Sequence, residues 1–146
     1  MLKFTKKVDY SILILVHLTQ HPDLPVSAKE FAVRYRLSVP LVANLMKTLS
    51  RAELIESSRG KHGGYRLNQP PERITLGRVV GLVEGSFALT DCAPEHKGEV
   101  CCLQDICVSR RPLQVVHRKI MSFLDTTTIA ELAAQPQAPL AAASGG

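Results

Sequence analysis

Residues Ser27–Leu67 read SAKEFAVRYRLSVPLVANLMKTLSRAELIESSRGKHGGYRL, and the order of their local signals predicts the architecture of the chain. The first four residues, Ser27 to Glu30, form a capping box, in which a serine and a glutamate side chain bind free backbone N–H groups at a helix start. A helix should therefore begin at Ala28 and bury Phe31. It should be short, because residues 36–40 carry the signals of a tight turn and of a new helix start.

A second helix is predicted after this turn, with Ser38 as its N-terminal cap and Pro40 in its first turn, where the missing proline N–H is not needed. Its apolar residues fall at i, i+3, i+4 and i+7 and so share one buried face: Val42, Leu45, Met46 and Leu49. The opposite face is polar and basic: Asn44, Lys47, Thr48 and Arg51. This order of elements is the helix-turn-helix pattern, although a polar face by itself is usually only solvated.

A β-hairpin is predicted directly after these helices, with strands at 54–58 and 64–67. Its tip, residues 59–63, contains two glycines, two cations and a histidine. The glycines allow the backbone to approach phosphate closely, while Arg59, Lys61 and His62 supply charge or a probe for the minor groove. A hairpin in this position is a wing. A helix-turn-helix followed by a wing predicts a DNA-binding protein.

Helices are predicted on both sides of this unit. One spans about residues 6–20, and another begins after Thr75 and ends at Gly85. A long amphipathic helix is expected from about Ser109 to Leu124, and a second capping box at residues 128–131 opens a short terminal helix. The predicted fold class is mainly α: a winged helix-turn-helix with a small β-hairpin wing and a long C-terminal dimerisation helix.

Three parts are expected along the chain. Residues 1–70 form the winged helix-turn-helix DNA-binding domain. Residues 71–134 hold a helix, the cysteine loop and the dimerisation helix, and residues 135–146 form a disordered tail. The dimerisation helix carries apolar residues on one face: Leu113, Val116, Ile120, Phe123 and Leu124. A twofold partner would cover this face and match the palindromic sites that helix-turn-helix dimers read; the alternative is that the helix folds back onto its own chain.

The composition fits a compact globular protein. Of 146 residues, 45% are hydrophobic and only 5% aromatic, which indicates an aliphatic core. The net charge of +5 permits a nucleic-acid partner without demanding one. No apolar run approaches the roughly 20 residues that span a bilayer, and the first residues lack the features of a signal peptide. A cytoplasmic protein without a membrane segment is therefore expected.

All four cysteines lie between Cys92 and Cys107. Their spacing departs from the Cys-x2-4-Cys pairs of structural zinc sites. The set Cys92, Cys101 and Cys107 leaves gaps of eight and five residues, which suit a cluster of several irons better than one tetrahedral ion. In a reducing cytosol such a group is more often metal-binding or redox-active than structural. An iron–sulfur cluster is favoured, and a disulfide or redox switch and a zinc site remain as alternatives.

The combination of these features resembles the IscR/NsrR family of iron–sulfur transcription regulators over about residues 1–133. The features are the winged helix, the wing phrase His62-Gly63-Gly64-Tyr65-Arg66-Leu67, a helix ending in Glu84-Gly85, and spaced cysteines before a long helix. The wing phrase and the run Ala88–Cys92 look closest to the branch that controls SUF-type iron–sulfur cluster assembly. The resemblance implies a homodimer with antiparallel long helices, one [2Fe-2S] or [4Fe-4S] iron–sulfur cluster per subunit, and DNA affinity that depends on the cluster.

The resemblance also implies which thiols are ligands. By position, Cys92 is the first ligand and Cys107 the last, and Cys101 fits the middle ligand because its gap to Cys107 matches the family's last gap. Cys102 is then a spare thiol or a substitute for Cys101. The gap after Cys92 is longer than is common in the family.

The fourth ligand differs among members of this family. Some use a histidine three residues after the last cysteine, but this chain has Arg110 there, and a guanidinium cation cannot ligate a metal. The nitric-oxide sensors take an aspartate from the first helix of the other subunit. Asp9 matches that position, so the resemblance implies that Asp9 from the partner subunit completes the cluster; its alternative role is to offset the helix dipole.

The leading hypothesis is a cluster-sensing transcriptional regulator, a repressor of iron–sulfur assembly genes, that binds a palindromic promoter operator in double-stranded DNA as a homodimer. The alternatives are a nitric-oxide or redox sensor on the same scaffold and a cluster-free DNA-binding protein with a thiol switch. An enzyme is not predicted, because no nucleotide-binding glycine motif, His/Asp/Ser constellation or Cys-x-x-Cys pair is present. The expected DNA contacts come from the N-terminus, the second helix of the helix-turn-helix and the wing: Lys3, Ser38, Asn44, Lys47, Thr48, Arg51, Arg59, Lys61 and His62.

Overall fold

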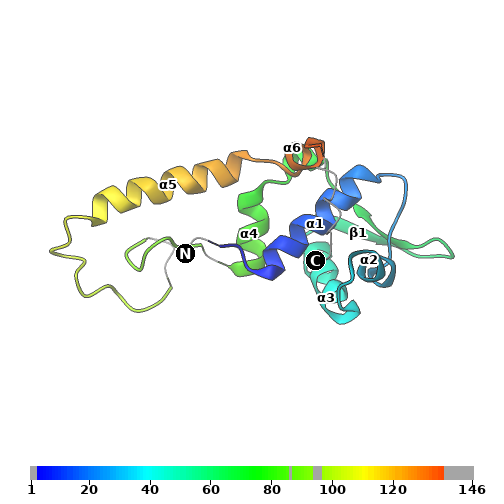
Figure 1. The fold of residues 1–146 in the computed structure, drawn as a ribbon, viewed down its shortest axis with the longest axis horizontal. Coiled ribbons are helices and arrows are strands. Elements are labelled where there is room, and N and C mark those ends of the chain that lie inside the picture. Colours follow the sequence, from blue (N-terminus) through cyan, green and yellow to red (C-terminus); the bar gives the residue numbers. More distant parts are fainter. Residues whose placement is uncertain (1–2, 86, 94–96, 137–146) are drawn as a thin grey trace, which may run out of the picture.

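The computed structural model describes residues 3–85, 87–93 and 97–136, and its elements follow the predicted order (Figure 1). They are α1 (Lys6–Gln20), α2 (Ala28–Tyr35), α3 (Val39–Arg51), β1 (Ile55–Ser58), β2 (Gly64–Leu67), the 3-10 turn η1 (Pro71–Arg73), α4 (Leu76–Glu84), α5 (Arg110–Thr126) and α6 (Ile129–Ala134). The two strands form one antiparallel hairpin. The predicted mainly α, winged helix-turn-helix fold class is confirmed. Most of the predicted tail lies outside the described residues.

Side-chain caps fix where five of the helices begin. The hydroxyls of Thr5, Ser38 and Thr75 each accept a hydrogen bond from a backbone N–H of the first turn. Ser27 and Thr128 form complete capping boxes with the glutamates three residues later. The long helix α5 is the exception, because Ser109 gives no side-chain cap and the first helical residue is Arg110.

One aliphatic core joins the helix-turn-helix to the C-terminal helices. Ile14, Leu15 and Leu18 of α1 are buried against residues of α2, α3, α4 and the end of α5. Helix α6 lies against α1 and adds the fully buried Ile129. Two backbone hydrogen bonds hold this C-terminal part in place, because Leu76 N–H donates to the Thr127 carbonyl and Ile129 N–H donates to the Ile74 carbonyl.

Helix α5 extends from this body as an arm, and the residues that lead into α5 lie at the far end of the arm (Figure 1). The C-terminal end of α5 is anchored by Leu124, which is 6% exposed. The other residues of the predicted face are more open, since Leu113, Val116 and Phe123 are 36%, 44% and 65% exposed. The predicted apolar face therefore exists, and the chain itself buries Leu124 but leaves Leu113, Val116 and Phe123 exposed. In the described part of the chain, no helix is both long enough and apolar enough to cross a membrane.

Candidate DNA-binding surface and cysteine loop

The turn between α2 and α3 is held by the backbone. Arg36 adopts the left-handed conformation, with φ 54°, and the Leu37 N–H donates to the Ala32 carbonyl at 2.9 Å. This closes α2 and redirects the chain into α3 within three residues. Phe31 and Ala32 of α2 and the four predicted apolar residues of α3 are buried. The polar face of α3 is thereby turned outward.

The predicted DNA contacts are mostly exposed. The predicted contacts that reach solvent are on α3 and the wing tip: Asn44, Lys47, Arg51, Arg59, Lys61 and His62. Thr48 is half-buried, and its hydroxyl donates a hydrogen bond to the Asn44 carbonyl oxygen at 3.0 Å. The Ser38 hydroxyl accepts from the Leu41 N–H, so it serves the helix cap. Lys3 lies elsewhere: with Phe4 and Phe87 it borders a small cavity of about 110 Å³ beside α5.

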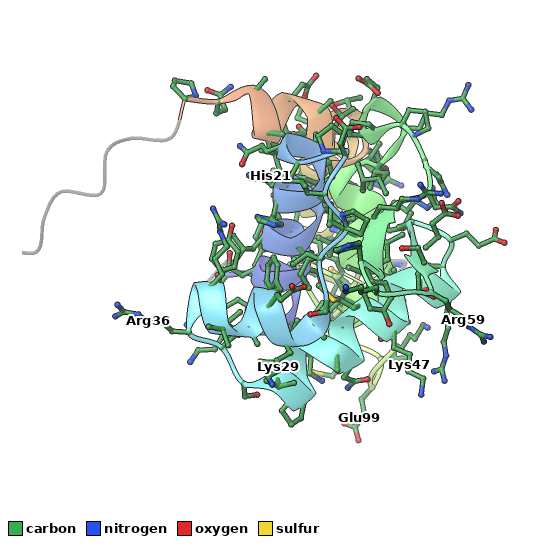
Figure 2. The ribbon with its side chains drawn as sticks, turned by 90° about the vertical axis from the view of Figure 1, so that its right-hand side faces the viewer. His21, Lys29, Arg36, Lys47, Arg59 and Glu99 are labelled. Atoms are coloured by element: carbon green, nitrogen blue, oxygen red, sulfur yellow. The ribbon has the colours of Figure 1, made fainter. Side chains whose placement is uncertain are left out.

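A basic residue of α2 belongs to the same surface and escaped the sequence reasoning. Figure 2 shows Lys29 of α2, Lys47 of α3 and Arg59 of the wing projecting from one side of the molecule. Lys29 follows the capping residue Ser27 by two positions, at the N-terminal end of α2. The first helix of a helix-turn-helix crosses the DNA backbone, which is the signal that could have identified Lys29.

Close backbone contacts explain the paired glycines of the wing. A Cβ on Gly64 would lie 2.7–2.9 Å from backbone atoms of Val26, and a Cβ on Gly63 would lie 2.4 Å from the Ser58 carbonyl oxygen. Val26 and Tyr65 exchange two backbone hydrogen bonds, of 3.1 and 2.8 Å. The wing is therefore attached to the loop that precedes α2. A side chain at position 64 would push the wing away from this loop, whereas one at position 63 would clash within the hairpin itself.

The charges of the wing divide between its stem and its tip. In the stem, Arg66 and Glu56 face each other across the strands and form an ion pair of 2.7 Å between Nε and Oε1. At the tip, Arg59, Lys61 and His62 are exposed. Arg66 is thus engaged by a carboxylate, and the tip presents its cations to solvent.

The cysteine loop connects α4 to α5 and contains four free thiols. Cys92, Cys101 and Cys107 are partly buried, whereas Cys102 is exposed. Within residues 3–85, 87–93 and 97–136, no three His, Cys, Asp or Glu side chains lie close enough together to hold one metal ion. The single chain therefore does not bring the three predicted cysteine ligands into one group.

Two side chains of α5 hold the start of this loop. Gln114 Nε2 donates to the Cys92 carbonyl at 3.3 Å, and the Leu89 N–H donates to His117 Nδ1 at 3.4 Å. His117 is 1% exposed, and its ring stacks on Phe87 at a centroid distance of 6.2 Å. Sequence reasoning missed His117, because a single histidine within a helix gives no local signal of what it contacts.

The second half of the loop turns back on itself before α5. The Gln104 N–H donates to the Cys101 carbonyl at 3.1 Å, and the Arg110 guanidinium donates to the Gln104 carbonyl at 3.1 Å. Arg110 therefore braces the loop. Asp9, the predicted ligand from the partner, is exposed in the first turn of α1.

A histidine pair lies at the C-terminal end of α1, away from both regions. His17 is 5% exposed, and His21 stacks on it with ring centroids 4.5 Å apart. His17 Nδ1 is 2.9 Å from the Tyr35 hydroxyl. Burial, the neighbouring His21 and Arg34 together lower the pKa of His17 to about 4, so its imidazole is neutral at pH 7.

Comparison with known proteins places this geometry in one family. Residues 4–135 match Rrf2, described as an iron-dependent transcriptional regulator. The chain is 32% identical to the HTH-type transcriptional regulator NsrR of Halalkalibacterium halodurans, over 84% of this chain and 82% of that protein. It is 30% identical to the HTH-type transcriptional regulator IscR of Aliivibrio salmonicida, over 90% of this chain and 77% of that protein.

A solved structure shares the fold over nearly its full length. The structure of CymR, the global cysteine regulator of Bacillus subtilis, superposes with a TM-score of 0.75 at 30% identity and covers 91% of this chain and 97% of its own. These relatives are transcriptional regulators rather than enzymes. The chain belongs to the Rrf2 family of DNA-binding transcriptional regulators.

Proposed function

We propose that this regulator senses an iron–sulfur cluster and represses iron–sulfur cluster assembly genes as a homodimer on a palindromic operator. The observation that carries the proposal is the set of four free thiols in the loop between α4 and α5, of which three are partly buried and one is exposed. Thiolates are the usual ligands of iron–sulfur clusters, so the donor chemistry of the loop fits the group. Cys92, Cys101 and Cys107 would hold the cluster, and Cys102 would remain free or replace Cys101.

The position of the loop supports a link between the cluster and DNA binding. Helix α4 packs against α1 and α3 in the core of the helix-turn-helix, and α5 begins where the loop ends. A cluster would supply iron–thiolate bonds that draw separate parts of the loop together. Closing the loop would change how the arm is held relative to the DNA-binding surface, because the loop connects the two.

The exposed face of α5 supports the homodimer. Leu113, Val116 and Phe123 form an apolar stripe that the chain itself leaves open. An isologous contact between two copies of this helix would cover both stripes at once and give twofold symmetry.

We further propose that Asp9 of the partner completes each cluster, since its carboxylate is exposed and α1 begins beside α4. A carboxylate is a harder ligand than thiolate, which would leave one iron open to exchange.

The wing and α3 are proposed to contact DNA through the exposed residues described above. Neutralising the wing tip with Arg59→Ala and Lys61→Ala should reduce the slope of log affinity against log salt by about 2, because each phosphate contact releases condensed counterions. The loss should be similar on specific and random DNA. The control variant, Arg73→Ala with Lys119→Ala, removes the same charge from η1 and α5 and should leave the slope unchanged. An unaltered slope in the wing variant would remove the wing from the interface.

The cluster proposal is tested on protein purified without oxygen. We expect iron and sulfide in about equal amounts and visible absorption from sulfur-to-iron charge transfer. Operator DNA, selected from a random pool, should bind cluster-loaded and apo protein with affinities that differ by about 10- to 100-fold. Protein without iron, or equal affinities of the two forms, would contradict the proposal.

The same experiment distinguishes the proposed sensor of cluster supply from a second candidate function, a nitric-oxide or redox sensor. The observation that favours it is the exposed carboxylate of Asp9 at the position used by nitric-oxide sensors of this type. In that case the cluster should be present, and DNA affinity should change on exposure to nitric oxide or air rather than with cluster supply. A protein that holds no iron but changes affinity on thiol oxidation would indicate a cluster-free thiol switch.

A further inference from the structure

We infer that Arg78 of α4 is a positioning residue for operator recognition, because its guanidinium ties the end of α3 to the base of the wing. The inference rests on the proposed DNA surface, in which α3 and the wing both contact the duplex. Two elements that read one DNA site must be held in a fixed relative orientation, to within about 0.5 Å. Arg78 would supply this constraint without touching DNA itself.

The joint between α3 and the wing is short and adopts an uncommon backbone conformation. Helix α3 ends at Arg51 and β1 begins at Ile55, so residues 52–54 set the angle between them. Glu53 lies in this joint with φ 59°, in the left-handed region that residues with a side chain rarely adopt. Such a conformation persists where surrounding contacts hold it. The joint therefore depends on the groups that bind its backbone.

Side chains from two other segments bind the carbonyls of this joint. Asn68 Nδ2 and Gln69 Nε2, which follow β2, donate to the Glu53 carbonyl oxygen at 3.1 and 2.8 Å. Arg78 Nη2 donates to the Ala52 carbonyl oxygen at 3.4 Å, and Arg78 Nη1 donates to Gln69 Oε1 at 2.8 Å. One planar guanidinium thus holds the end of α3 and the residue after the wing at the same time. The point-like ammonium of a lysine lacks this fixed fork of donors.

The first turn of α4 gives Arg78 a firm support. On this turn, the Leu76 N–H donates to the Thr127 carbonyl oxygen at 2.9 Å. Gly77 lies so close to Asp125 of α5 that a Cβ at this position would clash with the carboxylate. The turn that carries Arg78 is therefore attached to the base of the arm. Arg78 connects this base to the joint between α3 and the wing.

The test compares operator DNA, selected from a random pool, with random DNA on the full-length protein. Arg78→Lys keeps the positive charge but removes the fork. Its operator affinity should fall about 5- to 10-fold, as for the loss of one base contact, while its affinity for random DNA changes by less than about 2-fold. The slope of log affinity against log salt should stay the same, because the charge is retained. The matched control is Arg73→Lys, since Arg73 is an exposed arginine of η1; it should keep both affinities.

Arg78→Gln distinguishes positioning from a direct contact with a phosphate. If Arg78 positions the joint, the glutamine and lysine variants should lose the same share of operator discrimination. A direct phosphate contact would instead let lysine bind like the wild type, while glutamine would weaken operator and random DNA equally and reduce the salt slope by about 1. That result would overturn the inference. Urea unfolding of each variant ensures that folded proteins are compared.

Amide hydrogen exchange measures the joint in the absence of DNA. The Asn68 N–H donates to the Leu54 carbonyl oxygen at 3.0 Å, directly beside the joint. This amide should exchange several-fold faster in Arg78→Lys than in the wild type or in Arg73→Lys. Unchanged exchange, or an unchanged ratio of operator to random affinity in Arg78→Lys, would overturn the inference. An unaltered salt slope in the wing-tip variant alone would instead contradict the proposed DNA surface, so the two failures are distinguishable.

Discussion

Gly64→Ala is expected to destabilise the folded protein by about 3 kcal/mol and to detach the wing from the body. The new methyl group would lie 2.7–2.9 Å from the N, C and O atoms of Val26, which are backbone atoms and cannot rotate away. The clash can be relieved only if β2 moves away from Val26, and this movement breaks the two backbone hydrogen bonds between Val26 and Tyr65. Urea unfolding measures the free energy, and a DNA-binding assay should show that operator affinity falls with it.

Gly81→Ala is the matched control for this change. Gly81 lies within α4, and a Cβ built on it meets nothing within 4 Å. Alanine loses less conformational entropy than glycine in a helix, so Gly81→Ala should stabilise the protein by about 0.5–1 kcal/mol. If Gly64→Ala unfolds at the same urea concentration as the wild type, the wing is not held by the loop before α2.

Local signals were sufficient for most of the helices. The capping boxes that open α2 and α6 each involve residues three positions apart, so the sequence alone predicts where these helices begin. The apolar spacing of α3 likewise predicts its buried face, and all four residues are buried. The helix predicted from about Ser109 to Leu124 is α5, which spans Arg110–Thr126 with Ser109 at its N-terminal boundary, although no side chain caps it.

Contacts between distant residues could not be predicted in this way. The sequence predicts a glycine-rich wing, but it does not reveal that Gly64 lies against Val26, 38 positions earlier in the chain. The contacts of α6 with α1, and of His117 with Leu89, also depend on how separate segments pack. For the cysteines, the sequence shows that they are close along the chain. Their mutual distances depend on the path of the loop, whose described part exposes Val100, Leu103, Ile106 and Val108 to solvent.

Replacing the cysteines one at a time should remove the cluster in three variants and preserve it in one. Serine is nearly the same size as cysteine but lacks the thiolate that iron prefers. Cys92→Ser, Cys101→Ser and Cys107→Ser should reduce iron from about one cluster per subunit to nearly none. Cys102→Ser should retain iron, absorption and operator affinity, because Cys102 is exposed while the other three thiols are partly buried. Iron analysis of anaerobically purified variants gives the measurement.

The Cys102→Ser variant is the control that shows which of the two adjacent cysteines, Cys101 or Cys102, is the middle ligand. Cys101 and Cys102 differ by one position, so a loop that turned the other way would exchange their roles. Iron loss in Cys102→Ser with iron retained in Cys101→Ser would show that the assignment is displaced by one residue.

Asp9→Ala tests the fourth ligand in the same series of variants. If Asp9 is a ligand from the partner, this variant should keep its three thiolate ligands, but the absorption spectrum of its cluster and the rate at which the cluster decays in air should change. An unchanged spectrum, decay rate and DNA response would leave Asp9 with the smaller role of a carboxylate at a helix N-terminus, worth about 0.3–1 kcal/mol.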